Sequence, residues 1–288
     1  MMTETRMHRR NVRRPRWFAR GGLALAAVSL AWVTGCGRGS AATQASSAPR
    51  TVKPESAVAA GFPSTPVGRA IVQAGRDGKY AFVLFYRPKE QASETMRATV
   101  ERAKSKLEAK AVLLSVDIGA QSEAALVERF RAQQAPLPLT LVIAPNGATV
   151  RAFTKPVDEQ ALSGAFVSPK VAEVAKALQD RKVVALCLQG PATKHNRESR
   201  RAAEQFVADQ KLGGQAVLVM ADPSRETDLL KRCRISAAPA EATIVLLAPP
   251  GSMVGTFAGA TTKEALLQKL QSASSSCSSG GCGPSGCQ

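Results

Sequence analysis

The side chains with the greatest capacity for chemistry in this sequence are its six cysteines. Three of them, Cys277, Cys282 and Cys287, lie in the final segment CSSGGCGPSGCQ with the spacing C-x4-C-x4-C. Because Ser, Gly and Pro offer nothing apolar to pack against, we expect these thiols to be exposed. They could form a tail disulfide with one thiol left over, bind Cu(I) or Zn(II), or exchange with a partner's disulfide. An inert tail is the fourth alternative.

The tail spacing is a weak metal signal, because structural zinc sites usually take their cysteines in C-x2-C pairs. We therefore expect no cofactor, keep Cu or Zn at the tail as an open alternative, and leave the metal unknown. Glycine-rich phosphate loops, paired-histidine metal motifs and Gly-x-Ser-x-Gly are absent from the sequence. The histidine His195 lies in a polar loop without a cysteine placed to pair with it, and we expect it to be a solvated surface residue.

Two further cysteines lie in apolar surroundings. Cys187 belongs to the run VVALCLQ, and Cys233 lies on the apolar side of LLKRCRI. Both fit the small hydrophobic role that free cysteines often play in a core. The alternative is a disulfide between Cys187, on a predicted strand, and Cys233, on a predicted helix. Such a pair is conceivable because a helix and a strand of one domain are neighbours.

The start of the sequence predicts a secretory signal. A basic region is followed by the apolar run GGLALAAVSLAWVTG, which is shorter than a typical membrane-spanning helix. The ending Val33-Thr34-Gly35-Cys36 resembles the lipobox of bacterial lipoproteins. That resemblance implies removal of residues 1–35, acylation of Cys36, a membrane anchor and a location in the bacterial cell envelope, facing the periplasm. An ordinary signal peptide or an uncleaved anchor are the alternatives.

The charge of the chain is strongly positive, at +17 for pH 7. Such a charge favours anionic neighbours such as lipid headgroups, but the Lys and Arg residues are mixed with Glu along the predicted helices, as on a solvated surface. Because these basic helices lack interleaved aromatic residues, we expect no nucleic-acid partner.

The middle of the chain is a duplication. The pattern of the segment EAALVERFRAQQAPLPLTLVIAPNGATVRAF is repeated later in the chain by ETDLLKRCRISAAPAEATIVLLAPPGSMVGTF. The matching residues Phe153 and Phe257 lie 104 residues apart. The Ala/Ser/Pro-rich segment before the first copy indicates a flexible tether, and a Ser/Gly-rich tail follows the second. The predicted parts are a signal at 1–35, a linker at 36–64, domains at 65–167 and 168–271, and a tail at 272–288.

Each copy predicts the same order of elements: helix, strand, helix, strand, helix, hairpin and helix. The first two strands of each copy are short and apolar, as strands covered on both faces should be. In the first copy, TLVIA and TVRAF are joined by the turn residues Pro-Asn-Gly, which predict a hairpin. The fold class is therefore α/β, with two tandem domains of mixed sheets flanked by helices, a disordered N-terminal tether and a disordered C-terminal tail.

The first copy resembles thioredoxin-like proteins from Tyr80 to about Phe166. The matching pieces are the strand FVLFY leading into a helix, SVD at the end of the next strand, LVERF, and PLTLVIAPNG. The resemblance implies a cis-proline before the last of these strands and a groove beside it that receives a partner polypeptide. Pro138 is the better candidate for that proline, although Pro136 is the residue that Pro239 matches in the second copy.

The resemblance also shows what is missing. Active members of the family carry Trp-Cys-x-x-Cys where the first strand meets its helix, whereas this chain has FYRPKEQASET, which puts Glu90 and Ser93 in the two cysteine positions. The second copy has LQGPATKHNRES there, again without cysteine. We therefore expect a non-enzymatic, lipid-anchored binding platform for a partner protein. A thiol oxidoreductase, or a Cu- or Zn-binding protein, working through the tail cysteines is the alternative.

Overall fold

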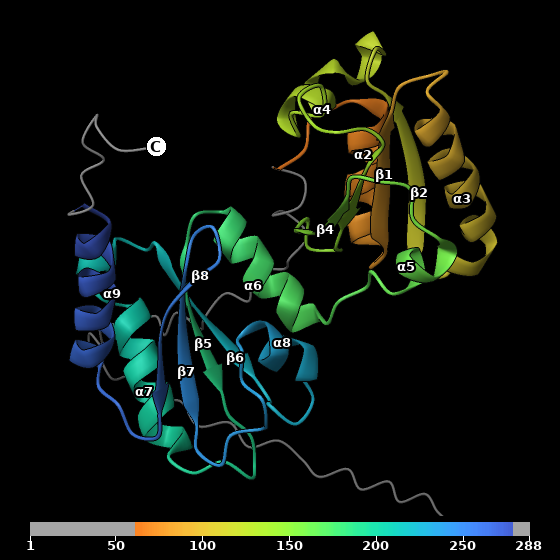
Figure 1. The fold of residues 1–288 in the computed structure, drawn as a ribbon. Helices are drawn as coiled ribbons and strands as arrows, with labels where there is room; N and C mark the ends of the chain where they lie inside the picture. Colours follow the sequence, from red (N-terminus) through yellow and green to blue (C-terminus); the bar gives the residue numbers. More distant parts are fainter. Residues whose placement is uncertain (1–60, 279–288) are drawn as a thin grey trace, which may run out of the picture. The chain divides into compact units, whose positions relative to one another are not determined.

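A computed structural model describes residues 61–278 of the chain. The predicted signal, Cys36, nearly all of the predicted linker, Cys282 and Cys287 lie outside these residues. Within the described part, no helix is both long enough and apolar enough to cross a membrane. The ribbon in Figure 1 shows two sheets, each with its own helices, which are called domain 1 and domain 2 below.

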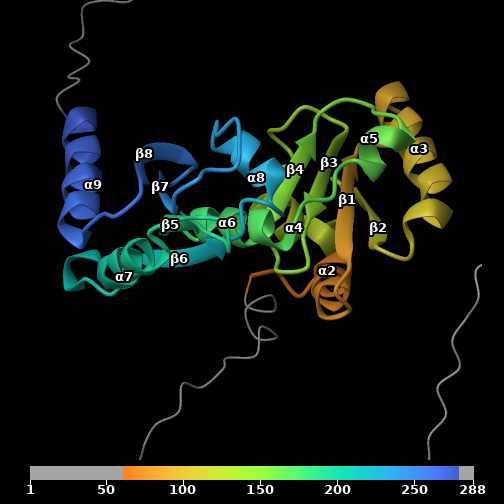
Figure 2. The same ribbon diagram turned by 90° about the horizontal axis from the view of Figure 1, so that it is seen from below.

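Domain 1 is built on a four-stranded sheet in the order β2-β1-β3-β4. Strands β1 and β2 are parallel, whereas β3 runs antiparallel to both β1 and β4. Helices α2 and α4 contribute to the core on one face, and α3 and α5 on the other (Figure 2). The elements in chain order are α2 (Pro66–Arg76), β1 (Tyr80–Tyr86), α3 (Gln91–Leu107), β2 (Ala111–Asp117), η1 (Gln121–Glu123), α4 (Ala124–Arg129), β3 (Leu139–Ile143), β4 (Thr149–Phe153) and α5 (Glu159–Ser163).

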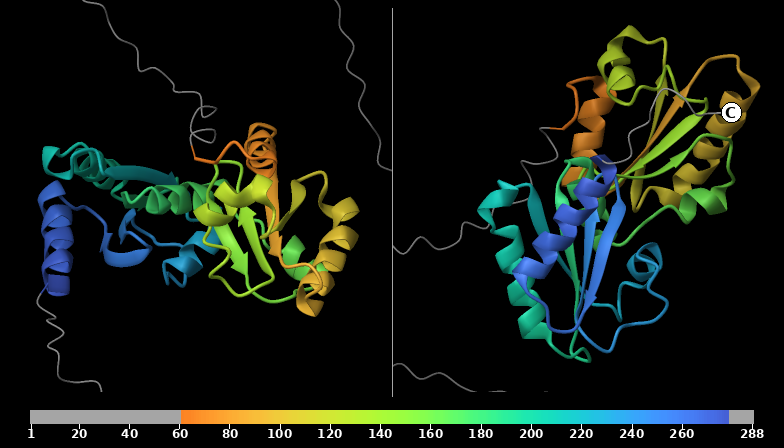
Figure 3. Two further views of the ribbon diagram at one scale, coloured as in Figure 1. Left: turned by 90° about the horizontal axis from the view of Figure 1, so that it is seen from above. Right: turned by 60° about the vertical axis from the view of Figure 1, so that its left-hand side comes forward.

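Domain 2 repeats this plan, with the sheet order β6-β5-β7-β8 and the same strand directions. Helices α6 and α8 cover one face, and α7 and α9 the other (Figure 3). The elements are α6 (Pro169–Gln179), β5 (Val183–Leu188), α7 (Asn196–Val207), η2 (Gln210–Leu212), β6 (Ala216–Ala221), α8 (Thr227–Arg232), β7 (Thr243–Ala248), β8 (Ser252–Ala258) and α9 (Lys263–Ser278).

The last helix corrects one predicted boundary. Helix α9 ends at Ser278, so it continues past residue 272, where we expected the tail to begin, and it includes Cys277. The serine-rich segment SASSSCS therefore extends the helix that precedes it. The physical reason is that serine is only a modestly poor helix former, so a helix already begun continues through it.

The predicted helix starts are confirmed, because both copies open with the same cap. Thr65 accepts a hydrogen bond from the Gly68 N–H through its side chain, and Ser168 accepts one from the Val171 N–H. A proline follows each cap at the first helical position, where an N–H would have no partner within the helix.

The first strand of each domain is buried on both faces, as its apolar sequence predicts. In β1, Phe82 and Leu84 pack toward α3, whereas Val83 and Phe85 pack toward α2 and α4. This alternation follows from the two-residue period of a strand. The hairpin, the element order and the α/β class predicted from the sequence are also confirmed.

The duplication extends to unusual details of the backbone. Lys89, just before α3, has φ = 63°, and His195, just before α7, has φ = 59°. Left-handed conformations are uncommon for residues other than glycine, so a matched pair is informative. The register shifts between Val142 and Ile143 in β3, and between Leu246 and Leu247 in β7. These matched irregularities align the two copies independently of sequence similarity.

Candidate functional site

The helix start of domain 1 holds the two residues predicted in the cysteine positions. Glu90 is the N-cap of α3, and Ser93 lies in the first turn, with its side chain fully buried. The Ser93 hydroxyl donates to Glu90 Oε2 at 3.3 Å and accepts from the Arg87 N–H at 3.4 Å. The structure thus brings Glu90 and Ser93 into contact. Among the described residues, the one base in contact with this buried hydroxyl is the Glu90 carboxylate, which is weak, and the site offers no thiol for exchange.

Three prolines, Pro88, Pro136 and Pro138, lie in segments that leave the sheet at the end where α3 begins. Pro88 lies in the loop before α3, and Pro138 immediately precedes β3. Because Phe85 pairs with Leu139, this loop and the segment 136–138 extend from the same end of the sheet. We call the loop 87–90 and the segment 136–138, taken together, the proline surface.

The peptide bond between Leu137 and Pro138 is cis, and Pro138 is buried. The bonds before Pro136 and Pro239 are not cis. The second cis bond in the described residues joins Pro249 and Pro250 in the turn between β7 and β8. The sequence pattern did not point to that second bond.

Leu137 is a residue of the proline surface with open main-chain groups and a partly buried side chain. In the part of the chain that the structure describes, neither its N–H nor its C=O has a hydrogen-bond partner. Its side chain is half-buried and packs against the core, whereas Pro136 beside it is exposed. A half-buried residue that keeps a free donor and a free acceptor can pair with an added extended chain.

The matching loop of domain 2 is held by polar contacts that sequence reasoning missed. The buried Thr193 hydroxyl lies 2.5 Å from Asn196 Oδ1 and accepts from the Gly190 N–H at 2.9 Å. Asn196 Nδ2 donates to the Gly190 carbonyl at 2.9 Å. The fully buried Ser199 donates to the Gly259 carbonyl at 2.7 Å. Aligning the two helix starts on their apolar residues would have paired Ser199 with Ser93.

Domain 2 also pairs this loop with the segment before β7. The Lys194 N–H donates to the Ala240 carbonyl at 3.0 Å, and the Ala242 N–H donates to the Lys194 carbonyl at 2.8 Å. Lys194 and Glu241 thereby form an isolated parallel β-bridge. His195, the next residue, is exposed, and its ring lies near Gly259 beside the Glu241 carboxylate.

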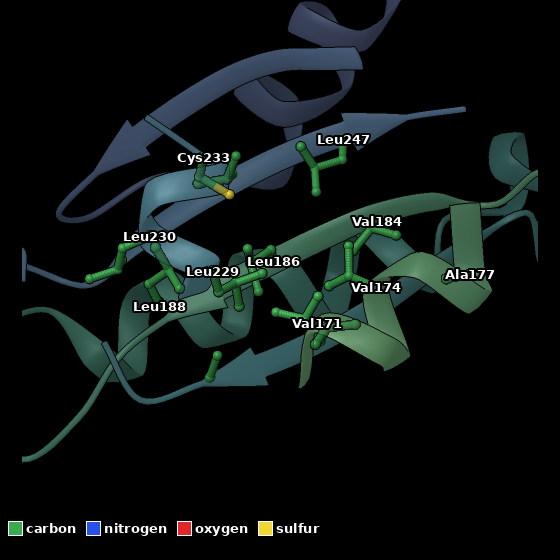
Figure 4. Close-up of a cluster of buried hydrophobic side chains, with 13 residues drawn as sticks. Val171, Val174, Ala177, Val184, Leu186, Leu188, Leu229, Leu230, Cys233 and Leu247 are labelled. Carbon is green, nitrogen blue, oxygen red and sulfur yellow. The ribbon is translucent and has the colours of Figure 1, made fainter. Parts of the chain in front are cut away.

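Cys187 and Cys233 are both free and buried, which corrects the alternative of a disulfide between them. The reason is the alternation of β5. Cys187 packs with Phe206 of α7 on one face of the sheet, whereas Cys233 packs with Leu229 and Leu186 on the other (Figure 4). Burial raises the pKa of both thiols, that of Cys187 to about 11. Neither thiol is suited to exchange, because the thiolate is the reactive form.

No group of three or more His, Cys, Asp or Glu side chains that could hold a metal is found among residues 61–278. The side chain of Cys277 is not described, and Cys282 and Cys287 lie outside the structure. The expectation of no cofactor, and the alternative of Cu or Zn at the tail, both stay predictions.

No protein-family model and no curated protein matches the chain. Among solved structures it is similar to the first two thioredoxin domains of Saccharomyces cerevisiae Eps1p, at 10% identity over 73% of this chain and 98% of that one, with a TM-score of 0.30. Human ERp44 in its zinc-bound form is 17% identical over 69% of this chain and 56% of its own, with a TM-score of 0.30. The germline-specific thioredoxin Deadhead of Drosophila melanogaster is 24% identical over 35% of this chain and 90% of its own, with a TM-score of 0.28.

The sheet orders, strand directions and helix positions define two tandem thioredoxin-like domains. Neither has a cysteine at the start of the helix that follows its first strand. In domain 1 this position holds a Glu–Ser contact next to open main-chain groups, and in domain 2 it holds a closed polar network.

Proposed function

We propose that this protein is a lipid-anchored component of the bacterial cell envelope that binds an extended segment of a partner polypeptide. Binding takes place at the proline surface of domain 1 and involves no thiol exchange. Acylated Cys36 anchors the chain in the membrane.

The open main chain of Leu137 is the observation that carries this proposal. Among residues 61–278 its N–H and C=O have no partner, and the neighbouring Arg87, Pro88 and Lys89 are exposed. Extended peptides add to exposed main-chain edges through hydrogen bonds of this kind. In domain 2 the matching segment is paired with another stretch of the chain. This pairing supports the proposal that this part of the fold binds an extended segment.

The contact between Glu90 and Ser93 supports the absence of thiol exchange. Dithiol chemistry at a helix start needs two cysteines there, and domain 1 has a half-buried carboxylate and a fully buried hydroxyl instead. The two cysteines of domain 2 are buried in its core. Sulfur chemistry by the mature chain would therefore depend on the tail.

A tail-based function is the second candidate. Because Cys187 and Cys233 are buried, Cys277, Cys282 and Cys287 are the thiols left for an envelope oxidoreductase or for Cu(I) or Zn(II) binding. Either activity would disappear when these three cysteines are replaced by Ser, a change called the tail-serine variant below. Thiol counting by mass spectrometry with metal analysis of the reduced protein distinguishes the two activities.

Leu137→Pro should weaken polypeptide binding, because proline removes the free N–H; the loss of the leucine side chain is controlled by the alanine variant below. One hydrogen bond contributes roughly 1 kcal/mol, so we expect an affinity loss of about fivefold. The measurement is fluorescence anisotropy with labelled, reduced and carboxymethylated α-lactalbumin, an unfolded chain without free thiols.

Leu137→Ala is the matched comparison, because it shortens the side chain and keeps the N–H. It should lose less affinity than Leu137→Pro. Equal binding by the native protein and Leu137→Pro would contradict the assignment of the surface, and the absence of binding by the native protein would contradict the proposed function itself.

A further inference from the structure

The two domains differ in the main-chain pairing of the segment that precedes the third strand of each sheet. Register pairs Pro138 of domain 1 with Ala242 of domain 2, because Phe85 faces Leu139 and Leu188 faces Thr243. The left-handed residues Lys89 and His195 occupy equivalent positions in the two loops. Aligning the loops on these residues places Pro88 of domain 1 opposite Lys194 of domain 2. These matches identify the atoms that close the surface in domain 2.

Both closing bonds of domain 2 use an N–H that domain 1 lacks. The Lys194 N–H donates to Ala240, and the Ala242 N–H donates to Lys194. The residues at the matching positions are Pro88 and Pro138, which have no N–H. Domain 1 therefore cannot form either bond, and within the described part of the chain the segment before β3 stays unpaired.

Other contacts hold the domain 2 loop in the closed position. Thr193 and Asn196 tie the loop to Gly190, and Ser199 ties the helix start to Gly259. Next to the bridge, the Glu241 carbonyl accepts from the Thr243 hydroxyl at 3.1 Å. Leu137, which matches Glu241, has no such partner among the residues that the structure describes, and Leu139 stands in place of Thr243. Domain 2 thus satisfies several groups at the position where domain 1 leaves them free.

We infer that Lys194 acts as an internal ligand of domain 2, so that the tandem has one open polypeptide-binding surface, in domain 1, and one surface closed by its own chain. The closed copy is a latent site for the same class of ligand, an extended polypeptide segment. This inference rests on the proposed function for what binds, but the closure itself does not depend on any ligand.

Amide hydrogen exchange, resolved by NMR on the full mature chain, tests the closure without a ligand. The Ala242 and Lys194 amides are hydrogen-bonded, so they should exchange at least about tenfold more slowly than the Leu137 amide, after correction for intrinsic rates. Equal rates for Ala242 and Leu137 would overturn the inference, whatever the protein is found to bind. A chain that shows this contrast and yet binds no polypeptide would contradict the proposed function alone.

The second test transfers the prolines of domain 1 to domain 2. Lys194→Pro/Ala242→Pro removes both donors, and prolines occupy the matching positions in domain 1, although the bond before Pro138 is cis and the bond before Ala242 is not. A photocrosslinking residue at the exposed Ala238 should capture labelled carboxymethylated α-lactalbumin several-fold more in this variant than in the native chain.

Lys194→Ala is the matched control for that transfer. It removes the side chain but keeps the N–H and C=O that form the bridge, so capture at Ala238 should stay at the native level. Capture that rises as much in Lys194→Ala as in the proline variant would overturn the main-chain closure. Unchanged capture in a folded proline variant would overturn the latent site. A far-ultraviolet circular dichroism spectrum establishes folding of each variant.

Discussion

Glu90→Cys/Ser93→Cys in the tail-serine variant should create a thiol–disulfide oxidoreductase, whereas we expect the tail-serine variant alone to lack this activity. The two positions are the N-cap and first turn of α3, and their present side chains are in contact at 3.3 Å. A thiolate at a helix N-terminus is stabilised, which lowers a cysteine pKa from about 8.5 to about 7 or below. Reduction of insulin by dithiothreitol, followed by turbidity, should be clearly faster with the double variant than with the tail-serine variant.

Glu101→Cys/Lys104→Cys provides the matched control, because it places two cysteines with the same spacing on the exposed middle of α3. These thiols lack the helix terminus and should leave insulin reduction at background. Comparable activity in both double variants would show that the helix start of domain 1 has no special capacity for this chemistry. Activity of the tail-serine variant alone would contradict the absence of a working thiol pair in the folded domains.

Cys187 should make domain 2 less stable at alkaline pH. Burial raises the pKa of its thiol from 9.0 to about 11, so between these values the folded state keeps the proton and the unfolded state releases it. The free energy of unfolding therefore falls as pH rises from 9 to 11, and the contribution is fully present below pH 9. Two pKa units correspond to a loss of up to about 3 kcal/mol.

Urea unfolding at pH 8 and pH 10.5 measures this effect, with tail-serine protein and tail-serine protein carrying Cys187→Ala. The Ala variant has a smaller core side chain and should be less stable at pH 8, but it should lose less stability on going to pH 10.5. Burial also raises the pKa of Tyr80. Both proteins contain Tyr80, so its contribution to the pH dependence cancels in the comparison. An identical loss in both proteins would mean that the Cys187 thiol ionises without unfolding.

The architecture was predictable because its signals are local and occur twice. Thr65 and Ser168 cap helices through their immediate neighbours, and the Pro-Asn-Gly turn closes a hairpin over a few residues. The contact between Glu90 and Ser93 was also within reach, since three residues along a helix bring side chains to one side. Duplication then allowed each copy to be checked against the other.

The closure of domain 2 was not predictable in the same way. Lys194 and Ala242 lie far apart in sequence, and nothing in their side chains marks the main-chain bonds between them. The disulfide alternative was wrong for a related reason: placing Cys187 and Cys233 on opposite faces of the sheet requires the phase of β5, which a fully apolar strand does not reveal. Helix α9 similarly continued through a serine-rich segment whose composition suggested a tail.

Mapping of bound polypeptide by NMR tests the central claim most directly. Carboxymethylated α-lactalbumin, added to the isotope-labelled mature chain, should shift the amide signals of Leu137 and Leu139 and of the start of α3, and leave those of Lys194 and Ala242 unchanged. Shifts confined to domain 2 or to the tail, with Leu137 unmoved, would contradict polypeptide binding at the proline surface of domain 1.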